Sequence, residues 1–240
     1  MIKVPDFDLG LPILERIDRF VVVRDDLLEG GTKMRGLVRL FLEVDRSNYV
    51  YASPTFGAAQ VALAMACHKF KKQAVIFVPM RAELSIYTRT ARDYGADIRL
   101  VKMGFLSHCT AEARRFCQRT PDSILLPFGI NHPAMVDGIA DAAKRIDYHP
   151  SEVWSAVSSG TLTRSLQRAW PSAKFFGVSV GHKPTKDQRG SAVMFAAEEK
   201  FAQRAKHPPP FPSAINFDAK VWTFVQKHAS EDALFWNVAK

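Results

Sequence analysis

The stretch Phe20-Val21-Val22-Val23-Arg24-Asp25-Asp26-Leu27-Leu28-Glu29-Gly30-Gly31-Thr32-Lys33-Met34-Arg35 joins an apolar run, two glycines and the start of an amphipathic segment. The run from Phe20 to Val23 predicts a strand, and the apolar spacing from Lys33 to Val44 predicts a helix. The glycines between them allow the backbone to turn sharply. The stretch therefore predicts a strand, a tight turn and a helix, with Lys33 at the start of the helix.

Short apolar runs and longer segments with helical periodicity alternate along the rest of the chain. We expect further strands at 49–52, 74–78, 97–101, 123–126, 153–157 and 175–180, and further helices at 57–70, 85–94, 111–118, 133–146, 162–170, 192–205 and 218–228. Strands that alternate with helices indicate βαβ units and mainly parallel sheets. The sequence therefore predicts an α/β fold with mainly parallel sheets flanked by helices.

Composition places the chain among globular proteins with a core, because 47% of its residues are hydrophobic and 24% are charged. No apolar run approaches the ~18 residues of a membrane span, and the first residues show no signal-peptide pattern. We therefore expect a cytoplasmic protein without a membrane partner. Cys67, Cys109 and Cys117 form no CxxC pair, so free thiols are expected rather than disulfides.

The net charge of +9 leaves two interpretations open. A basic protein can favour an anionic partner such as nucleic acid, an acidic surface or a phosphorylated ligand. The charge can equally serve solubility alone. Local clusters at 68–72 and 182–186 do not form a recognisable motif.

Lys33 is the first of several candidates at the carboxyl ends of strands, where ligands gather in open α/β sheets. A lysine at a helix start is partly desolvated and lies in the positive field of the helix dipole, and both effects favour its neutral form. A neutral amine is what Schiff-base chemistry requires. The alternative is an ordinary surface lysine at a helix start.

Ser158-Ser159-Gly160-Thr161 follows the strand predicted at 153–157 and precedes a helix. Small hydroxyl residues and a glycine at a helix start can bind a phosphate through backbone N–H groups and side-chain donors. A simply capped turn is the alternative. The GxxxxGK spacing of a nucleotide-binding P-loop is absent.

Two further turns hold polar candidates. Ser53-Pro54-Thr55-Phe56-Gly57 offers hydroxyls and amides that can hold a carboxylate, although an ordinary turn has the same composition. Asp218, at the start of the helix predicted at 218–228, is either an N-cap or, if buried beside a heterocycle, a partner for a protonated pyridine nitrogen.

Other chemistries find little support. The histidines show no metal-ligand spacing, so no metal site is expected; they are His68, His108, His132, His149, His182, His207 and His228. No G-x-S-x-G elbow of a serine hydrolase is present. The tryptophans fall within apolar elements and are expected in the core; they are Trp154, Trp170, Trp222 and Trp236.

Taken in order, these turns resemble the tryptophan synthase β-like family of pyridoxal-phosphate enzymes (fold type II). The similarity is nearest to the branch of aminocyclopropanecarboxylate deaminase and D-cysteine desulfhydrase. Val23-Arg24-Asp25-Asp26 and Gly30-Gly31-Thr32-Lys33-Met34-Arg35 match its RxD strand end and its GG-N/T-K-x-R motif. Gly129-Ile130-Asn131-His132-Pro133 with Gly138 is similar to its G-x-x-H-P…G segment, and Phe175-Phe176-Gly177-Val178 to a later strand.

The resemblance implies roles for individual residues. Lys33 would carry pyridoxal 5'-phosphate as a Schiff base and act as the catalytic residue. The cofactor would be bound further by Ser158, Ser159, Gly160, Thr161 and Asp218, with Asp218 beside the pyridine nitrogen. The substrate would be bound by Ser53, Thr55, Gly57 and His132.

The chain departs from the family pattern at three places. The loop 53–60 lacks the asparagine that bonds the cofactor's ring oxygen in the S-x-G-N pattern. The phosphate turn retains a single glycine, Gly160. Phe217 stands where the branch has a tyrosine, which removes a hydroxyl.

The resemblance further implies two lobes: 1–47 with 128–240 would form the larger cofactor lobe, and 48–127 the smaller lobe that closes on substrate. It implies a lyase that decarboxylates, eliminates or deaminates at Cα or Cβ, and a homodimer as in relatives. Three hypotheses about the substrate stay open. The first is an amino-acid group attached to a modified base in DNA, as in phage thymine hypermodification, which would place the protein in a host cytoplasm. The second is a free small amino acid, and the third a catalytically silent module that binds nucleic acid.

Overall fold

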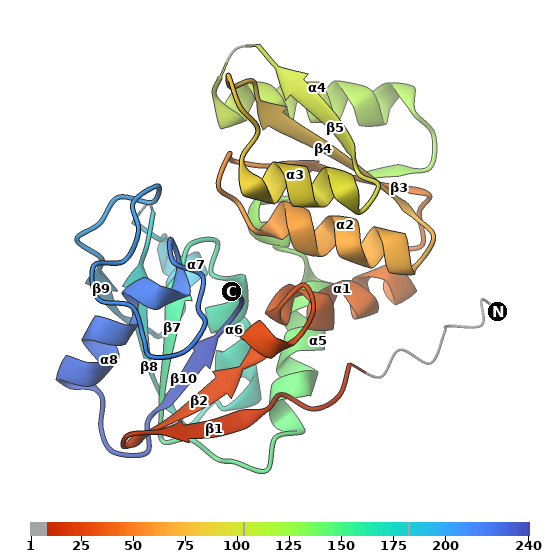
Figure 1. The fold of residues 1–240 in the computed structure, drawn as a ribbon. Helices are drawn as coiled ribbons and strands as arrows, with labels where there is room; N and C mark the ends of the chain where they lie inside the picture. The colour runs from red at the N-terminus through yellow and green to blue at the C-terminus, as the bar shows by residue number, and fades with distance from the viewer. Residues whose placement is uncertain (1–8, 103, 182) are drawn as a thin grey trace.

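The computed structural model describes residues 9–102, 104–181 and 183–240. His182 and the first eight residues of the predicted larger lobe lie outside this range. The chain folds around two sheets, each flanked by helices (Figure 1). The predicted α/β architecture with mainly parallel sheets is therefore confirmed.

The larger sheet contains the first and the last strands of the chain. Its order is β1-β2-β10-β7-β8-β9. The strands are β1 (Leu14–Ile17), β2 (Phe20–Arg24), β7 (Glu152–Val157), β8 (Lys174–Ser179), β9 (Val193–Ala196) and β10 (Leu234–Asn237). All neighbours pair in parallel except β1 and β2, which form an antiparallel pair. Because β10 lies between β2 and β7, the end of the chain runs beside the glycine turn that precedes Lys33.

The smaller sheet is fully parallel and is built from one continuous part of the chain. Its order is β5-β4-β3-β6. The strands are β3 (Asn48–Ala52), β4 (Gln73–Pro79), β5 (Asp97–Val101) and β6 (Ser123–Leu126). The helices α2 (Ala59–Lys69) and α3 (Ile86–Asp93) cover one face, and α4 (Leu106–Arg119) covers the other (Figure 1). Both faces are buried, which explains the continuous apolar runs of β3 and β4.

Helices α1 (Thr32–Glu43) and α5 (Pro133–Lys144) lie between the two sheets (Figure 1). They approach closely, because a Cβ on Gly138 would lie 2.7 Å from the carbonyl oxygen of Arg35. The remaining helices are α6 (Thr161–Ala169), α7 (Lys186–Arg189), α8 (Trp222–His228) and short 3-10 turns at Asp25–Leu27, Phe128–Ile130 and Asp218–Lys220. Because α1 carries Lys33 and lies between the two sheets, the packing of both sheets determines where Lys33 lies.

One predicted element is wrong. The helix expected over 192–205 is absent, and Val193–Ala196 instead pairs with β8 as the edge strand β9. Phe195 stacks on Trp154 with ring centroids 5.4 Å apart. Sheet pairing and this aromatic contact outweigh the helix preference of the alanines and glutamates that follow.

Other expectations about packing are met. The four tryptophans are buried, and the three cysteines are free thiols. The helix expected at 85–94 is α3, and Ser85 caps it by accepting a hydrogen bond from the Thr88 N–H. Among the helices of the described residues, none is long and apolar enough to cross a membrane.

Candidate active site

A pocket lies where α1, the carboxyl end of β3, the turn after β7 and the end of the chain meet. Its wall includes Lys33, Tyr51, Tyr87, Ser158, Ser159 and Asp218. Aromatic rings close it further, namely Phe56, Phe128, Phe201 and Phe217. Among the described residues that line it, Lys33 and Asp218 are the charged ones. The pocket therefore combines an apolar wall with one amine and one carboxyl group.

Lys33 is the second residue of α1 and is partly buried. Its Nζ donates a hydrogen bond to the carbonyl oxygen of Gly129 at 3.4 Å. Burial lowers the pKa of Lys33 to about 8, and the negative charge of Asp218 acts in the opposite direction. A larger fraction of this amine is neutral at physiological pH than of an exposed lysine, so it is a better nucleophile and base.

Asp218 is fully buried at the start of a 3-10 turn. Its Oδ2 accepts a hydrogen bond from the Val238 N–H at 3.3 Å, whereas its Oδ1 has no partner among the described residues. Burial raises its pKa well above the usual value, against the charge of Lys33. A buried carboxyl oxygen without a partner is unfavourable, so a ligand that presents an N–H group would fit here. The N-cap of this turn is Phe217, and within the described residues no hydrogen bond links the Asp218 side chain to the first turn.

The residues of the predicted phosphate turn, 158–161, differ in their exposure to the pocket. Ser158 and Ser159 lie on the pocket wall. Thr161 is buried behind them, and its Oγ1 is 3.1 Å from Oγ of Ser159. Gly160 has a φ of 77° at the N-terminus of α6, and a Cβ there would collide with the carbonyl group of Gln188. Of this turn, the pocket wall therefore includes the two serines that precede α6.

Gly129 connects three parts of the site. Its φ of 69° lies in the left-handed region, and a Cβ would collide with the side chain of Ser159. Its N–H donates to the hydroxyl of Tyr51 at 3.2 Å, while its carbonyl accepts from Lys33. Only glycine satisfies both the backbone conformation and the close contact with the phosphate turn.

Of the four predicted substrate residues, Gly57 lies on the pocket wall. The other three make contacts within the chain. The Ser53 hydroxyl donates to the carbonyl of Pro54 at 3.0 Å, and the Thr55 carbonyl accepts from the Ser85 hydroxyl at 2.6 Å. His132 caps α5, because its Nδ1 accepts from the Ala134 N–H at 3.2 Å. Substrate binding stays a prediction for all four residues.

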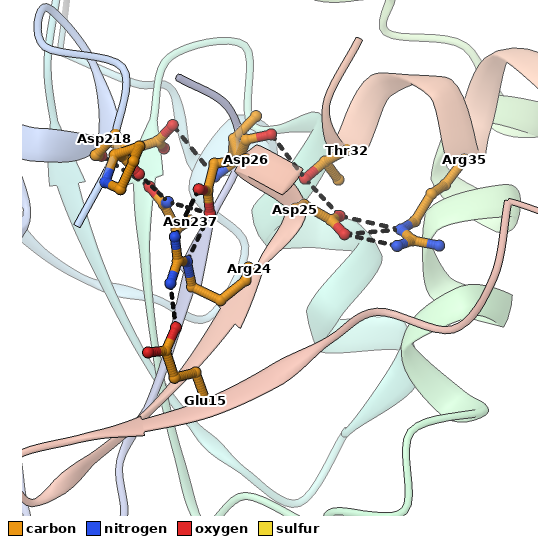
Figure 2. A network of polar contacts seen from close by, with 11 residues as sticks. Glu15, Arg24, Asp25, Asp26, Thr32, Arg35, Asp218 and Asn237 are labelled. Carbon is orange, nitrogen blue, oxygen red and sulfur yellow. Dashed lines mark hydrogen bonds and ion pairs between the residues drawn. The ribbon is translucent and has the colours of Figure 1, made fainter. Parts of the chain in front are cut away.

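A buried ion pair holds the start of α1 in place. The carboxylate of Asp25 accepts hydrogen bonds from Arg35, at 3.0 Å from Nε and 2.6 Å from Nη2, and from the Thr32 hydroxyl at 2.8 Å (Figure 2). Trp236 donates from Nε1 to the same Thr32 oxygen at 2.8 Å. These contacts fix the residues on both sides of Lys33 against the larger sheet.

A second buried pair lies next to it. Asp26 accepts two hydrogen bonds from Arg24 at 2.8 Å each, in a bidentate arrangement, and Arg24 also pairs with Glu15 (Figure 2). Asn237 donates to Asp26 as well. Sequence reasoning quoted Arg24 to Asp26 only as a motif and missed Asn237, since nothing local links residues more than 200 positions apart.

The model of the family described as pyridoxal-phosphate dependent enzyme matches residues 12–229. No curated protein sequence matches at a significant level. Several solved structures share the fold at low sequence identity.

Three of these structures illustrate the likeness. A homologue of ACC deaminase has a TM-score of 0.77 at 12% identity, covering 92% of this chain and 84% of that chain. The processed form of threonine deaminase isoform 2 from Solanum lycopersicum has a TM-score of 0.68 at 14% identity, covering 95% and 83%. A hydrogen sulfide-producing enzyme from Fusobacterium nucleatum has a TM-score of 0.65 at 14% identity, covering 96% of both chains.

At such identities these structures show the fold that the sequence resemblance implied. The family model adds the assignment itself, because it spans most of the chain, from β1 to the end of α8. It includes Lys33, both serines of the phosphate turn and Asp218. The chain belongs to the family of pyridoxal-phosphate dependent enzymes.

Proposed function

We propose that the protein is a pyridoxal-phosphate dependent lyase that breaks a bond at Cα or Cβ of an amino-acid group, by decarboxylation, elimination or deamination. The observation that carries this proposal is that Lys33 and Asp218 line the same pocket. One supplies an amine whose pKa is lowered to about 8, and the other a buried carboxyl with an unpartnered oxygen. Perturbed ionisable groups that converge in an apolar pocket are typical of active sites.

The residues present fit the cofactor. Lys33 would hold its aldehyde carbon, and Ser158 and Ser159, with the backbone of Gly160 and Thr161, would hold its phosphate. The unpartnered Oδ1 of Asp218 would bind the ring nitrogen. When bound, the cofactor supplies an aldehyde that takes up amines and a ring that accepts the electron pair left by bond breaking at Cα.

The protein's own groups would then hold and move protons. Asp218 would keep a proton on the ring nitrogen through Oδ1. Lys33, after the substrate amine has displaced it, would act through Nζ as the base that removes the Cα proton or as the acid that returns one. A pKa near the working pH suits both directions of transfer. The aromatic wall would exclude water from these steps.

The attachment to Lys33 can be tested directly. The purified protein, loaded with pyridoxal phosphate, should absorb near ~410–430 nm, and borohydride should remove that band and leave the cofactor fixed to the peptide that contains Lys33. Lys33→Ala should abolish the band and the fixation. Lys72→Ala is the matched control, because Lys72 pairs with Asp45 away from the pocket. Fixation that survives in Lys33→Ala would contradict the proposal.

The carrier of the amino-acid group is a separate question. Residues 48–127 contain eleven Lys and Arg but five Asp and Glu, so they hold six of the nine net positive charges. Tyr87 and Gly57 of this segment line the pocket. The positive charge of this segment motivates the hypothesis of an amino-acid group borne on DNA. The deaminases and the sulfide-producing enzyme among the similar structures favour the free amino acid.

Turnover separates these hypotheses. Amino-acid-bearing oligonucleotides and free amino acids should be compared over a range of salt concentrations. Turnover of the oligonucleotide that falls steeply with salt would support DNA as the carrier. Equal turnover of the free amino acid would exclude it, and retained cofactor without turnover of any amine would support the silent binding module.

The lobe division is also proposed. All four strands of the smaller sheet come from 48–126, in agreement with a closing lobe at 48–127 and a cofactor lobe from 1–47 with 128–240. The homodimer and the cytoplasmic location stay predictions.

A further inference from the structure

Tyr51, at the carboxyl end of β3, places a buried phenol at the pocket. The residue is 1% exposed and lies on the pocket wall. Its hydroxyl oxygen accepts the Gly129 N–H at 3.2 Å. Its own hydroxyl hydrogen has no acceptor among the described residues. A buried donor of this kind is unfavourable unless a ligand supplies an acceptor.

Tyr49 provides the comparison within the same strand. Both rings belong to the same hydrophobic cluster, on the face of β3 that packs against α2. The Tyr49 hydroxyl donates to the carbonyl of Val44 and accepts the Arg46 N–H at 3.4 Å. It lies away from the pocket and uses its hydrogen within the chain. Of the two phenols, only Tyr51 retains a donor for a ligand.

The position of Tyr51 relative to Lys33 indicates which atom it would meet. The hydroxyl of Tyr51 and the Nζ of Lys33 contact the N–H and the carbonyl of one residue, Gly129. The hydroxyl therefore lies on the lysine side of the pocket. In pyridoxal phosphate the ring oxygen is attached to the carbon next to the one that bears the aldehyde, so a lysine bound to the aldehyde has this oxygen as its neighbour.

We propose that Tyr51 donates a hydrogen bond to the ring oxygen of pyridoxal phosphate. This inference rests on the proposed function. It also accounts for a departure seen in the sequence, since the loop 53–60 contains no asparagine for this oxygen. A phenol from the preceding strand takes the place of an amide from the loop.

The hydrogen bond has a spectroscopic consequence. A donor to the ring oxygen stabilises its ionised form over its neutral form. The ionised form gives the visible band of the lysine-bound cofactor, and the neutral form absorbs in the near ultraviolet. Removing the donor should therefore move absorbance from the visible to the ultraviolet band, without any substrate present.

The first test compares Tyr51→Phe with Tyr49→Phe, both loaded with cofactor. Tyr51→Phe should change the ratio of the two bands by about tenfold, the usual effect of one hydrogen bond to a charged group. Tyr49→Phe should keep the spectrum of the unaltered protein, although it also loses a buried phenol. Equal spectra for all three proteins, at equal cofactor content, would overturn the inference.

The second test uses 3-deoxypyridoxal phosphate, which lacks the ring oxygen. Tyr51→Phe should weaken binding of pyridoxal phosphate about tenfold and binding of the analogue less than twofold. Equal weakening of both would show that Tyr51 acts on the fold and not on this oxygen. If Tyr51→Phe does not fold, the unaltered protein decides, because equal affinities for cofactor and analogue would overturn the inference.

These outcomes separate the inference from the proposed function. If the unaltered protein does not bind pyridoxal phosphate, both are overturned. If it binds the cofactor at Lys33 but Tyr51→Phe changes neither the spectrum nor the preference for the ring oxygen, only the role of Tyr51 is overturned.

Discussion

Asn237 donates a hydrogen bond from Nδ2 to Oδ1 of Asp26 at 2.8 Å, and so joins the last strand of the larger sheet to the end of β2 (Figure 2). The same Nδ2 donates to the carbonyl of Pro212 at 2.8 Å, and its Oδ1 accepts from Ser213 at 2.7 Å. The next residue, Val238, donates to Asp218. Asn237 therefore positions the segment that holds one oxygen of the Asp218 carboxyl group.

Asn237→Asp should destabilise the protein, although the two side chains have nearly the same shape. It would replace a donor to Asp26 with a second buried carboxylate, and like charges in contact are unfavourable. We expect the free energy of unfolding at pH 7 to fall by about 2–4 kcal/mol in urea denaturation. Ser213→Ala, which removes a neighbouring hydrogen bond without adding charge, should cost about 1 kcal/mol. Equal stability of Asn237→Asp and the unaltered protein would contradict this account.

The buried pair of Asp25 and Arg35 should matter far more than a surface pair on the same helix. Arg35→Ala leaves Asp25 buried without its main partner, and we expect a loss of about 3–5 kcal/mol. Arg39→Ala breaks exposed ion pairs with Glu43 and Asp141 and should cost about 1 kcal/mol or less. Chemical denaturation of the two variants gives the comparison. Similar losses would mean that Arg35 does not hold α1 through Asp25.

Gly129→Ala tests whether the close contact between Gly129 and Ser159 is needed for the site. Alanine at a φ of 69° is strained, and its Cβ would also collide with Ser159. Gly95 has a φ of 84° with open space around the added Cβ, so Gly95→Ala carries the strain alone, about 1–2 kcal/mol. We expect Gly129→Ala to be less stable than Gly95→Ala and to bind pyridoxal phosphate at least about tenfold more weakly. Equal affinities, measured by titration of the apoproteins, would rule out a role of this contact in the site.

The sequence predicted those features that depend on consecutive residues, and it missed those that depend on residues far apart in the chain. Lys33 and the serines of the phosphate turn were identified because a strand, a turn and a helix are consecutive in the chain. Asp218 was identified at the start of a predicted helix, with its N-cap alternative left open. Only the order of the family motifs suggested a shared site with Lys33, since the two residues lie far apart in sequence. Tyr51 has the sequence context of an ordinary core tyrosine, and no local pattern distinguishes it from Tyr49.

The errors have a similar origin. The strand β10 was not predicted, because a short run near the end of the chain gains its structure by insertion between β2 and β7. The segment 192–205 was predicted as a helix because local preference favours one, whereas pairing with β8 and the contact of Phe195 with Trp154 make it begin as a strand. Long-range partners decide both cases.

Lys33→Met should raise the stability of the apoprotein at neutral pH. The folded-state pKa of Lys33 is about 8, below its ordinary value of 10.5, so the unfolded chain binds more protons between these values. The unaltered protein should therefore gain stability relative to Lys33→Met as pH rises from 8 to 10.5. At pH 7 the variant should be more stable by about 2–3 kcal/mol. Lys186→Met, at an exposed position, should show no such trend in denaturation curves measured across this range.

Asp218→Asn should separate stability from cofactor binding. Burial raises the pKa of Asp218 well above its usual value, so the folded protein binds more protons than the unfolded chain above pH 3.8. The stability of the unaltered apoprotein should fall relative to Asp218→Asn as pH rises from about 4 toward neutrality.

At pH 7 Asp218→Asn should therefore be at least as stable as the unaltered apoprotein, by urea denaturation. The amide carries no charge to pair with a protonated ring nitrogen, so we expect about tenfold weaker binding of pyridoxal phosphate. An affinity equal to that of the unaltered protein would show that Asp218 does not face the ring nitrogen. A variant less stable without cofactor would instead assign the carboxylate to the fold, through Val238 and the end of the chain.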